Sequence, residues 1–214
     1  MPEPLKSRWE ALDEETNWLH GRWKIYRQLF GTSPERVEVL NESAGAFFYI
    51  IQTVLMNDVE LTLSKFADAA RTSGRHNLTL ESLVKDVSQF DATLCKELNG
   101  MLVDYRRLCQ KVIHRRHKQL AHFDLATLMA EKSTPIPGAS RQEIEDALRA
   151  LRMFMNALQR KFTDAETAYG EIVLTTDGDQ LLSVLQRGLR YQELAAAGAV
   201  DWDDLRQHSK YFGI

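Results

Sequence analysis

Amphipathic segments that begin with helix-start signals dominate this sequence, and they constrain its fold more than any other feature. Ser33 and Pro34 have the residue types of a helix N-cap and first helical position. Thr79 can cap a short helix that runs to about residue 88, and Ser140 with Glu143 three positions later has the spacing of a capping box. Strand signals are few. We therefore predict an all-α helical bundle with a short C-terminal appendage.

Apolar residues at three- and four-residue spacing predict where the longer helices lie. One helix is expected from about residue 91 into the stretch 104–122, and another from residue 140 to about 162. The helix that begins at Pro34 has a broad apolar face, which predicts a position at the centre of the bundle. Residues 71–77 read as a loop, and 171–178 as a brief extended segment. A last helix over about 179–197, ended by Gly198, precedes a short element at 202–214.

Length and composition favour one soluble domain. The 214 residues, 44% apolar and 27% charged, are typical of a globular chain with a substantial core. We predict a helical domain over residues 1–170 and an appendage over 171–214 packed on the same domain. No apolar run approaches the roughly 20 residues of a membrane helix, and the first residues lack the core of a signal peptide. A cytoplasmic protein without a membrane partner is expected.

The two cysteines indicate a reducing compartment. Cys95 and Cys109 fall on one predicted helix, where fourteen residues span about 21 Å. A disulfide needs Cα atoms within about 7 Å. If that helix is continuous, both are free thiols.

Cations concentrate in one stretch of this slightly acidic chain, whose formal net charge is −3. Asp104 is the only acid within residues 104–122, and the stretch holds six basic residues: Arg106, Arg107, Lys111, Arg115, Arg116 and Lys118. Like charges one turn apart on a helix repel, so this pattern suggests an anionic partner, most simply phosphate. Nearby histidines add groups that exchange protons near neutral pH.

The cluster reads His114-Arg115-Arg116-His117-Lys118-Gln119-Leu120-Ala121-His122-Phe123-Asp124, and it resembles the HEPN superfamily, in particular the abortive-infection-like branch. Arg116, His117 and His122 match that family's arginine, polar residue and histidine. The upstream segment 29–36, Leu-Phe-Gly-Thr-Ser-Pro-Glu-Arg, and the following Ala-Phe-Phe run are also similar to that branch. The resemblance covers roughly residues 20–170. His117 is a departure, because the branch more often has Asn or Asp there.

The resemblance implies an all-α, usually dimeric and often metal-independent endoribonuclease, with two copies of the motif facing each other across the dimer interface. Some members are toxins or abortive-infection effectors, and others only bind. Arg116 and His122 would then be the catalytic residues. Arg115, His117, Lys118 and Lys111 would bind RNA phosphates, and Asp124 would support the site. No cofactor is implied.

Helix geometry leaves the principal arginine open. On a straight α-helix, positions 116 and 122 point about 120° apart, whereas Arg115 and His122 share nearly one face. Either the helix breaks inside the motif and Arg116 is the functional arginine, or it continues and Arg115 shares the work. Asp124 could cap a new helix over residues 125–132, which favours a break.

The residue types suit RNA cleavage by attack of the 2′-hydroxyl on the neighbouring phosphorus. Histidine, with a reference pKa of about 6.5, can take or give the proton. Arginine offers a planar, permanently charged fork to the phosphoryl oxygens. DNA lacks the attacking hydroxyl and should resist.

Simpler interpretations stand beside this one. His122 could be a half-buried histidine bonded to a carbonyl, and the cations a solvated helix face. His114, His117, His122 and Asp124 could be proposed as metal ligands, although the surrounding cations would oppose a divalent ion. Two functional classes follow: an active ribonuclease acting on RNA, with an antitoxin or other regulatory protein as a further partner, or a non-catalytic module that binds RNA, a nucleotide or a protein. A purely structural dimerisation module is the third.

Overall fold

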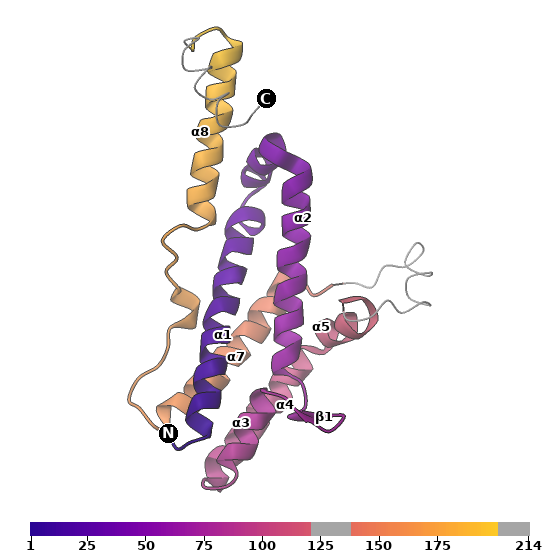
Figure 1. The fold of residues 1–214 in the computed structure, drawn as a ribbon, viewed down its shortest axis with the longest axis vertical. Coiled ribbons are helices and arrows are strands. Elements are labelled where there is room, and N and C mark those ends of the chain that lie inside the picture. The colour runs from indigo at the N-terminus through magenta and orange to yellow at the C-terminus, as the bar shows by residue number, and fades with distance from the viewer. Residues whose placement is uncertain (121–137, 201–214) are drawn as a thin grey trace. The chain divides into compact units, whose positions relative to one another are not determined.

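The computed structural model describes residues 1–120 and 138–200, and most of these residues are helical (Figure 1). The α-helices are α1 (Leu5–Tyr26), α2 (Pro34–Phe66), α3 (Leu80–Val87), α4 (Ala92–Leu108), α5 (Gln110–Arg115), α7 (Arg141–Arg160) and α8 (Gly178–Ala196). Short turns of other helix types are η1 (Arg27–Gly31) and η2 (Arg116–Leu120), both π-helical, and the 3₁₀ turn η3 (Tyr169–Glu171). The prediction of an all-α protein is confirmed.

Local capping interactions place three of these helices where the sequence predicted them. The Thr79 hydroxyl accepts a hydrogen bond from the amide of Ser82 at the start of α3. The Asp91 carboxylate accepts one from the amide of Leu94 at 2.9 Å at the start of α4. At the start of α7, Ser140 and Glu143 form the reciprocal capping box. These contacts satisfy backbone N–H groups that have no partner within their own helix.

The structure adds detail to two predictions about irregular segments. The expected loop at 71–77 contains a two-stranded hairpin, β1 (Arg71–Thr72) paired with β2 (Arg75–His76). Its turn residues Ser73 and Gly74 have φ of 49° and 81°, the positive values that a tight hairpin turn requires. The expected extended segment at 171–178 begins at the last residue of η3 and ends at the first residue of α8, and residues 172–177 between them form neither helix nor strand.

The chain forms two compact units. The first comprises residues 1–23 and 55–173, and the second comprises residues 24–54 and 174–214. The second unit therefore combines an internal segment with the C-terminal part of the chain.

In the first unit, α4 packs against α3 and α7. Tyr105 of α4 is fully buried, and its hydroxyl donates to the carbonyl of Leu63 at 2.7 Å. Cys109 is buried and Cys95 half-buried, and both are free thiols, as the spacing of the two residues predicted. Burial raises the pKa of the Cys109 thiol to about 12. This thiol is therefore protonated and unreactive at neutral pH.

In the second unit, the start of α8 is bound to η1. The Gln28 amide nitrogen donates to Asp177 and Asp179 at 2.7 and 2.9 Å, and the amide of Gly178 donates to the Gln28 side-chain oxygen at 3.0 Å. A Cβ atom at Gly178 would lie 2.9 Å from the Cβ of Gln28. Only glycine permits this close approach without a rearrangement.

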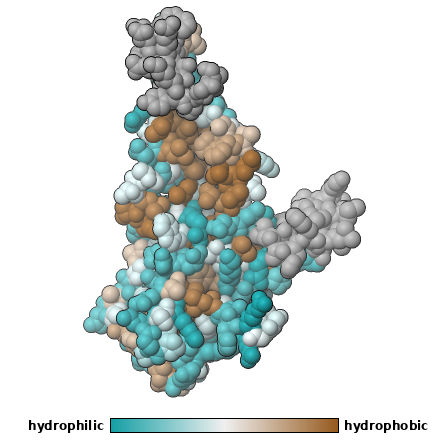
Figure 2. All heavy atoms as spheres, in the orientation of Figure 1, coloured by the Kyte–Doolittle hydropathy of each residue, from teal (hydrophilic) through white to brown (hydrophobic). Residues whose placement is uncertain are grey.

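The apolar face of α2 is only partly covered. Val59 and Leu63 of its C-terminal half are buried, as a central helix requires. In the N-terminal half, Phe47, Ile50 and Val54 are 57%, 59% and 55% exposed, so the prediction of a helix central along its length was wrong there. These residues recur at helical spacing on one face, and apolar residues gather on the face of the protein drawn in Figure 2.

By length and composition alone, α2 is the one helix among the described residues that could cross a membrane. A single such helix is a weak indication, because a core helix and a signal sequence satisfy the same criterion.

A buried histidine joins α1 to α7 in the first unit. His20 is 4% exposed, and its Nδ1 lies 2.8 Å from the carbonyl of Thr16 while its Nε2 lies 3.2 Å from Nη1 of Arg152. A carbonyl only accepts and a guanidinium only donates, so the ring is neutral with its proton on Nδ1. The pKa of His20 is lowered to about 4. Burial is the main cause and the charge of Arg152 adds to it, while the hydrogen bond to the Thr16 carbonyl and the charge of Glu145 act in the opposite direction.

This histidine should make stability depend on pH. Between about pH 6.5 and 4 the unfolded chain binds a proton at His20 that the folded chain does not, so the free energy of unfolding falls as the pH falls through this window. We expect a loss of about 1 kcal/mol between pH 7 and 5.5, measured by urea denaturation. His20→Gln should lose less over the same interval. Equal losses in the two proteins would contradict the assignment.

Candidate functional site

The basic cluster spans the end of α4, all of α5 and the turn η2 in the first unit. The helix changes geometry twice within it. Cys109 separates α4 from α5, with φ −85° and ψ 3°, and the helix widens to the π form at Arg116. Of the two alternatives left open by the sequence, a straight α-helix does not continue through the described part of the motif. Single π-helical turns are frequent at functional sites. His122 and Asp124, and the helix proposed over 125–132, lie outside the described residues.

Arg115 is held by a buried carboxylate. Its Nη1 lies 2.5 Å from Oε2 of Glu60, and its Nη2 donates to Asn57 at 3.0 Å. The Glu60 side chain has no exposed surface, and its other oxygen accepts a hydrogen bond from the amide of Ala139 at 3.2 Å. Glu60 of α2 thus contacts both α5 and Ala139, which directly precedes the N-cap of α7. This geometry gives Arg115 a structural task, beside the phosphate contact predicted for it.

Arg116 makes a two-pronged ion pair with Asp68. Both Nη atoms donate to the carboxylate at 2.8 Å, and Nη1 also lies 3.4 Å from the hydroxyl of Ser64. Nη2 donates to Nε2 of His117 at 3.0 Å. The Arg116 side chain is 14% exposed. These contacts fix the plane of the guanidinium at the first residue of the π-turn.

The contact with Arg116 also explains how a histidine can stand at position 117. The guanidinium nitrogen only donates, so Nε2 of His117 is the acceptor in this contact. An Asn or Asp side chain offers an oxygen acceptor for the same purpose. The departure from the resembling branch therefore preserves the chemistry of an acceptor beside the arginine.

Other cations of the cluster also have carboxylate partners. Lys111 lies 2.6 Å from Glu143 of α7, and Arg106 lies 2.6 Å from Glu81 of α3. Arg106 and Lys85 hold the pKa of Glu81 at about 2. Lys111 and the α7 cap hold that of Glu143 at about 2 as well. The positive charge of the sequence stretch is balanced in the fold, so an anion bound here has to compete with carboxylates.

Sequence reasoning did not identify these partners. Glu60 is an acid within the apolar run of α2, between Val59 and Leu61, and that position is the only sequence signal of a buried ion pair. Asp68 gives no comparable signal, because its role depends on α2 ending beside η2.

The metal alternative involved His114, His117, His122 and Asp124. Among the described residues, no group of three or more histidine, cysteine or acidic side chains could hold a metal ion. Two of the four proposed ligands lie outside those residues, so the alternative is not tested.

The helical fold is that of a HEPN-type domain. A HEPN family model described as AbiU2 matches residues 2–184, and the chain belongs to this abortive-infection family. No curated protein and no solved structure matches the chain. The matched range includes the whole basic cluster, but it does not assign a role to any residue in it.

Proposed function

We propose that the protein is a metal-independent endoribonuclease that acts as a toxin or antiphage effector in abortive infection. Family membership supports this proposal, and one observation carries it. Arg116 is held in a fixed plane by Asp68 and His117 at the start of a π-turn, six residues before His122. A guanidinium held in one orientation is suited to phosphoryl transfer, because its N–H donors need little reorganisation as negative charge develops on the phosphoryl oxygens.

In the proposed reaction, the 2′-oxygen attacks the adjacent phosphorus and the bond from phosphorus to the 5′-oxygen breaks. A base removes the proton of the 2′-hydroxyl, and an acid protonates the leaving 5′-oxygen. His122 performs proton transfer, and Arg116 stabilises charge on the phosphoryl oxygens. Lys111, Lys118 and His117 contribute to binding of the phosphate backbone. Arg115 contributes less, because Glu60 holds its guanidinium.

The test is cleavage of mixed RNA by the purified protein in EDTA. We expect products that end in a 2′,3′-cyclic phosphate, and a substrate with 2′-deoxyribose at the cleaved position should survive. Activity that disappears in EDTA and returns with a divalent metal would contradict the mechanism and favour the metal alternative.

The pairing of the described cations with carboxylates favours a second candidate, a non-catalytic HEPN module that binds RNA, a nucleotide or a partner protein. Tight RNA binding without cleavage by the wild-type protein would support it. If binding uses the phosphates, the affinity should fall steeply as salt rises. An affinity independent of salt would indicate that the basic cluster only faces solvent or other parts of the fold.

We also propose a cytoplasmic homodimer, held by apolar helix faces. The exposed apolar side chains of α2, including Phe47 and Ile50, suit burial against a second copy. Light scattering at micromolar concentration should give about twice the 24.6 kDa of one chain. Phe47→Glu should shift the mass toward the monomer. A wild-type mass of one chain across a dilution series would contradict the dimer. An antitoxin or other regulatory protein is a further proposed partner.

A further inference from the structure

A cleft in the first unit has a lining that contains none of the six basic residues of the stretch 104–122. It is lined mainly by α7 and the segment 166–171, with Met101 of α4 on one side, and its volume is about 450 Å³. Clefts of roughly 300–1,000 Å³ are the usual size for small-molecule ligands. None of the residues that line it belongs to the stretch 109–118 that contains the motif arginines.

Arg152 lines this cleft, and its guanidinium contacts the neutral side chain of His20. Its Nη1 donates to the buried, uncharged His20 at 3.2 Å, and among the described residues it has no carboxylate within ion-pairing distance. Tyr169, also lining the cleft, is fully buried, packs on His20 with ring centroids 5.8 Å apart, and donates its hydroxyl to Asp13. The base of the cleft is therefore a fixed polar network. Its acid, Asp13, is bound to Tyr169, and Arg152 makes no ion pair with the lining residues Glu166 and Glu171.

Two further arginines and an asparagine shape the rim. Arg149 pairs with Asp146 of its own helix at 3.1 Å, and Arg160 pairs with Glu166. The Asn156 side chain donates to the carbonyl of Thr167 at 3.1 Å and accepts from its amide at 3.0 Å. These two bonds fasten the segment 166–171 to α7. The segment 166–171, which forms one wall of the cleft, is thus held to α7 by hydrogen bonds.

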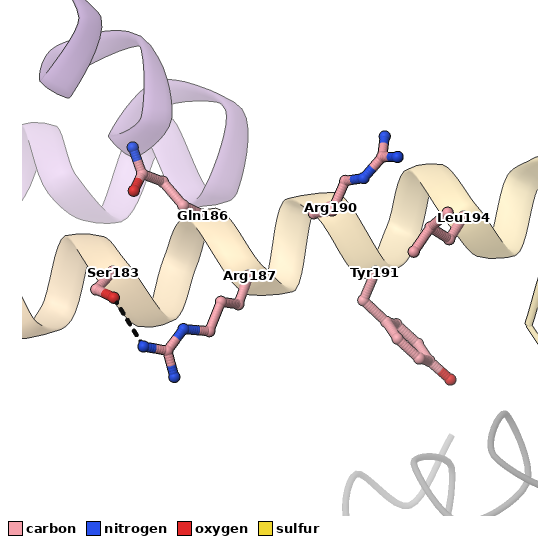
Figure 3. A pocket seen from close by; sticks show the side chains of 6 residues that line it. All are labelled: Ser183, Gln186, Arg187, Arg190, Tyr191 and Leu194. Carbon is pink, nitrogen blue, oxygen red and sulfur yellow. Dashed lines mark hydrogen bonds between the residues drawn. The ribbon is translucent and has the colours of Figure 1, made fainter.

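A cleft along α8 in the second unit makes a useful contrast. Its lining residues all come from this one helix, and its volume is about 470 Å³. Figure 3 shows that the guanidinium groups of Arg187 and Arg190 point away from each other, and Arg187 donates to Ser183 at 3.1 Å. Nothing converges on a ligand there. The cleft at Arg152 differs because two helices and a fastened segment surround it.

We propose that the cleft at Arg152 binds a small ligand that carries a phosphate group and is about the size of a nucleoside monophosphate. The planar fork of Arg152 matches two phosphate oxygens, and no ion-paired carboxylate among the described residues competes with a phosphate for this guanidinium. Met101 and Met153 on the same cleft offer flexible apolar surface to the rest of the ligand. This site is separate from the ribonuclease motif, and it stands whether or not the protein cleaves RNA.

The test measures binding of AMP to the full chain by isothermal titration calorimetry, with inorganic phosphate and adenosine titrated in parallel. AMP should bind more tightly than either fragment. Arg152→Gln should weaken AMP binding about 10- to 100-fold, the effect of losing hydrogen bonds to a charged group.

A second variant avoids the buried network. Met153 is 56% exposed, so Met153→Glu places a negative charge at the cleft without disturbing the core, and it should also weaken AMP binding. Val184→Glu is the matched control, because Val184 is 52% exposed on α8 and does not line this cleft. Three results would overturn the proposal: no AMP binding at millimolar concentration, phosphate binding as tightly as AMP, or equal weakening by Met153→Glu and Val184→Glu.

Discussion

Replacing His122 by alanine should reduce the rate of RNA cleavage by roughly 10²–10⁴-fold, which is the usual loss when a proton-transfer group is removed. The variant should keep the helical content and the oligomeric state of the wild type. The rate is measured on one RNA in EDTA, with the products separated by length. His114→Ala is the matched control, because His114 belongs to the same cluster and its side chain is exposed on α5. It should cleave at close to the wild-type rate.

Alanine substitutions of Arg115 and Arg116 should have different effects on the cleavage rate in the same assay. Arg116→Ala should lose activity comparable to His122→Ala, and Arg115→Ala should lose noticeably less when rates are compared at equal amounts of folded protein. The physical reason is that Glu60 holds Arg115 in the fold, whereas Arg116 begins the π-turn that leads toward His122. The opposite order would make Arg115 the principal arginine. If His114→Ala loses as much as His122→Ala, the assignment of the proton-transfer group is wrong.

Glu60→Gln should destabilise the protein by about 3 kcal/mol, because it removes the fully buried carboxylate that pairs with the largely buried charge of Arg115. The free energy of unfolding is measured from urea denaturation at neutral pH. The control is Asp104→Asn, which removes an exposed ion pair with Arg107 within α4 and should change stability by less than about 1 kcal/mol.

A double variant distinguishes the loss of the Glu60–Arg115 charge interaction from a loss of packing. Glu60→Leu with Arg115→Met removes both charges and should be clearly more stable than Glu60→Leu alone, since replacing a whole buried pair by apolar groups is often nearly neutral. If the loss of stability in the double variant equals the sum of the losses in Glu60→Leu and Arg115→Met, the pair contributes through packing rather than through charge. A change below 0.5 kcal/mol for Glu60→Gln would contradict the prediction.

The pairing of Arg116 with Asp68 has a consequence for the proposed reaction. A phosphate can reach the guanidinium only by sharing it with a carboxylate that already accepts two hydrogen bonds. Asp68 thus fixes the orientation of the Arg116 guanidinium, but it also weakens the attraction of that guanidinium for a phosphate. The same holds for Lys111, whose Nζ lies 2.6 Å from Glu143.

The sequence by itself determined the features that depend on a few neighbouring residues. The starts of α3, α4 and α7 follow from Thr79, Asp91 and Ser140, because a capping side chain reaches only the next turn. The all-α class and the HEPN resemblance follow from the same local patterns and from the cluster around Arg116. Gly198, which has φ of 70° and follows the C-cap Ala197 of α8, is another local feature that the sequence predicted.

Tertiary structure alone decided which charges are compensated and which apolar surface is covered. Arg115 meets Glu60 from 55 positions away, and Arg116 meets Asp68 from 48, so no local pattern shows that these cations are neutralised. The same holds for Phe47 of α2, whose apolar spacing is that of a buried residue although its side chain is exposed. Periodicity shows that a helix has an apolar face, but contacts between distant segments decide whether this chain or another molecule covers it.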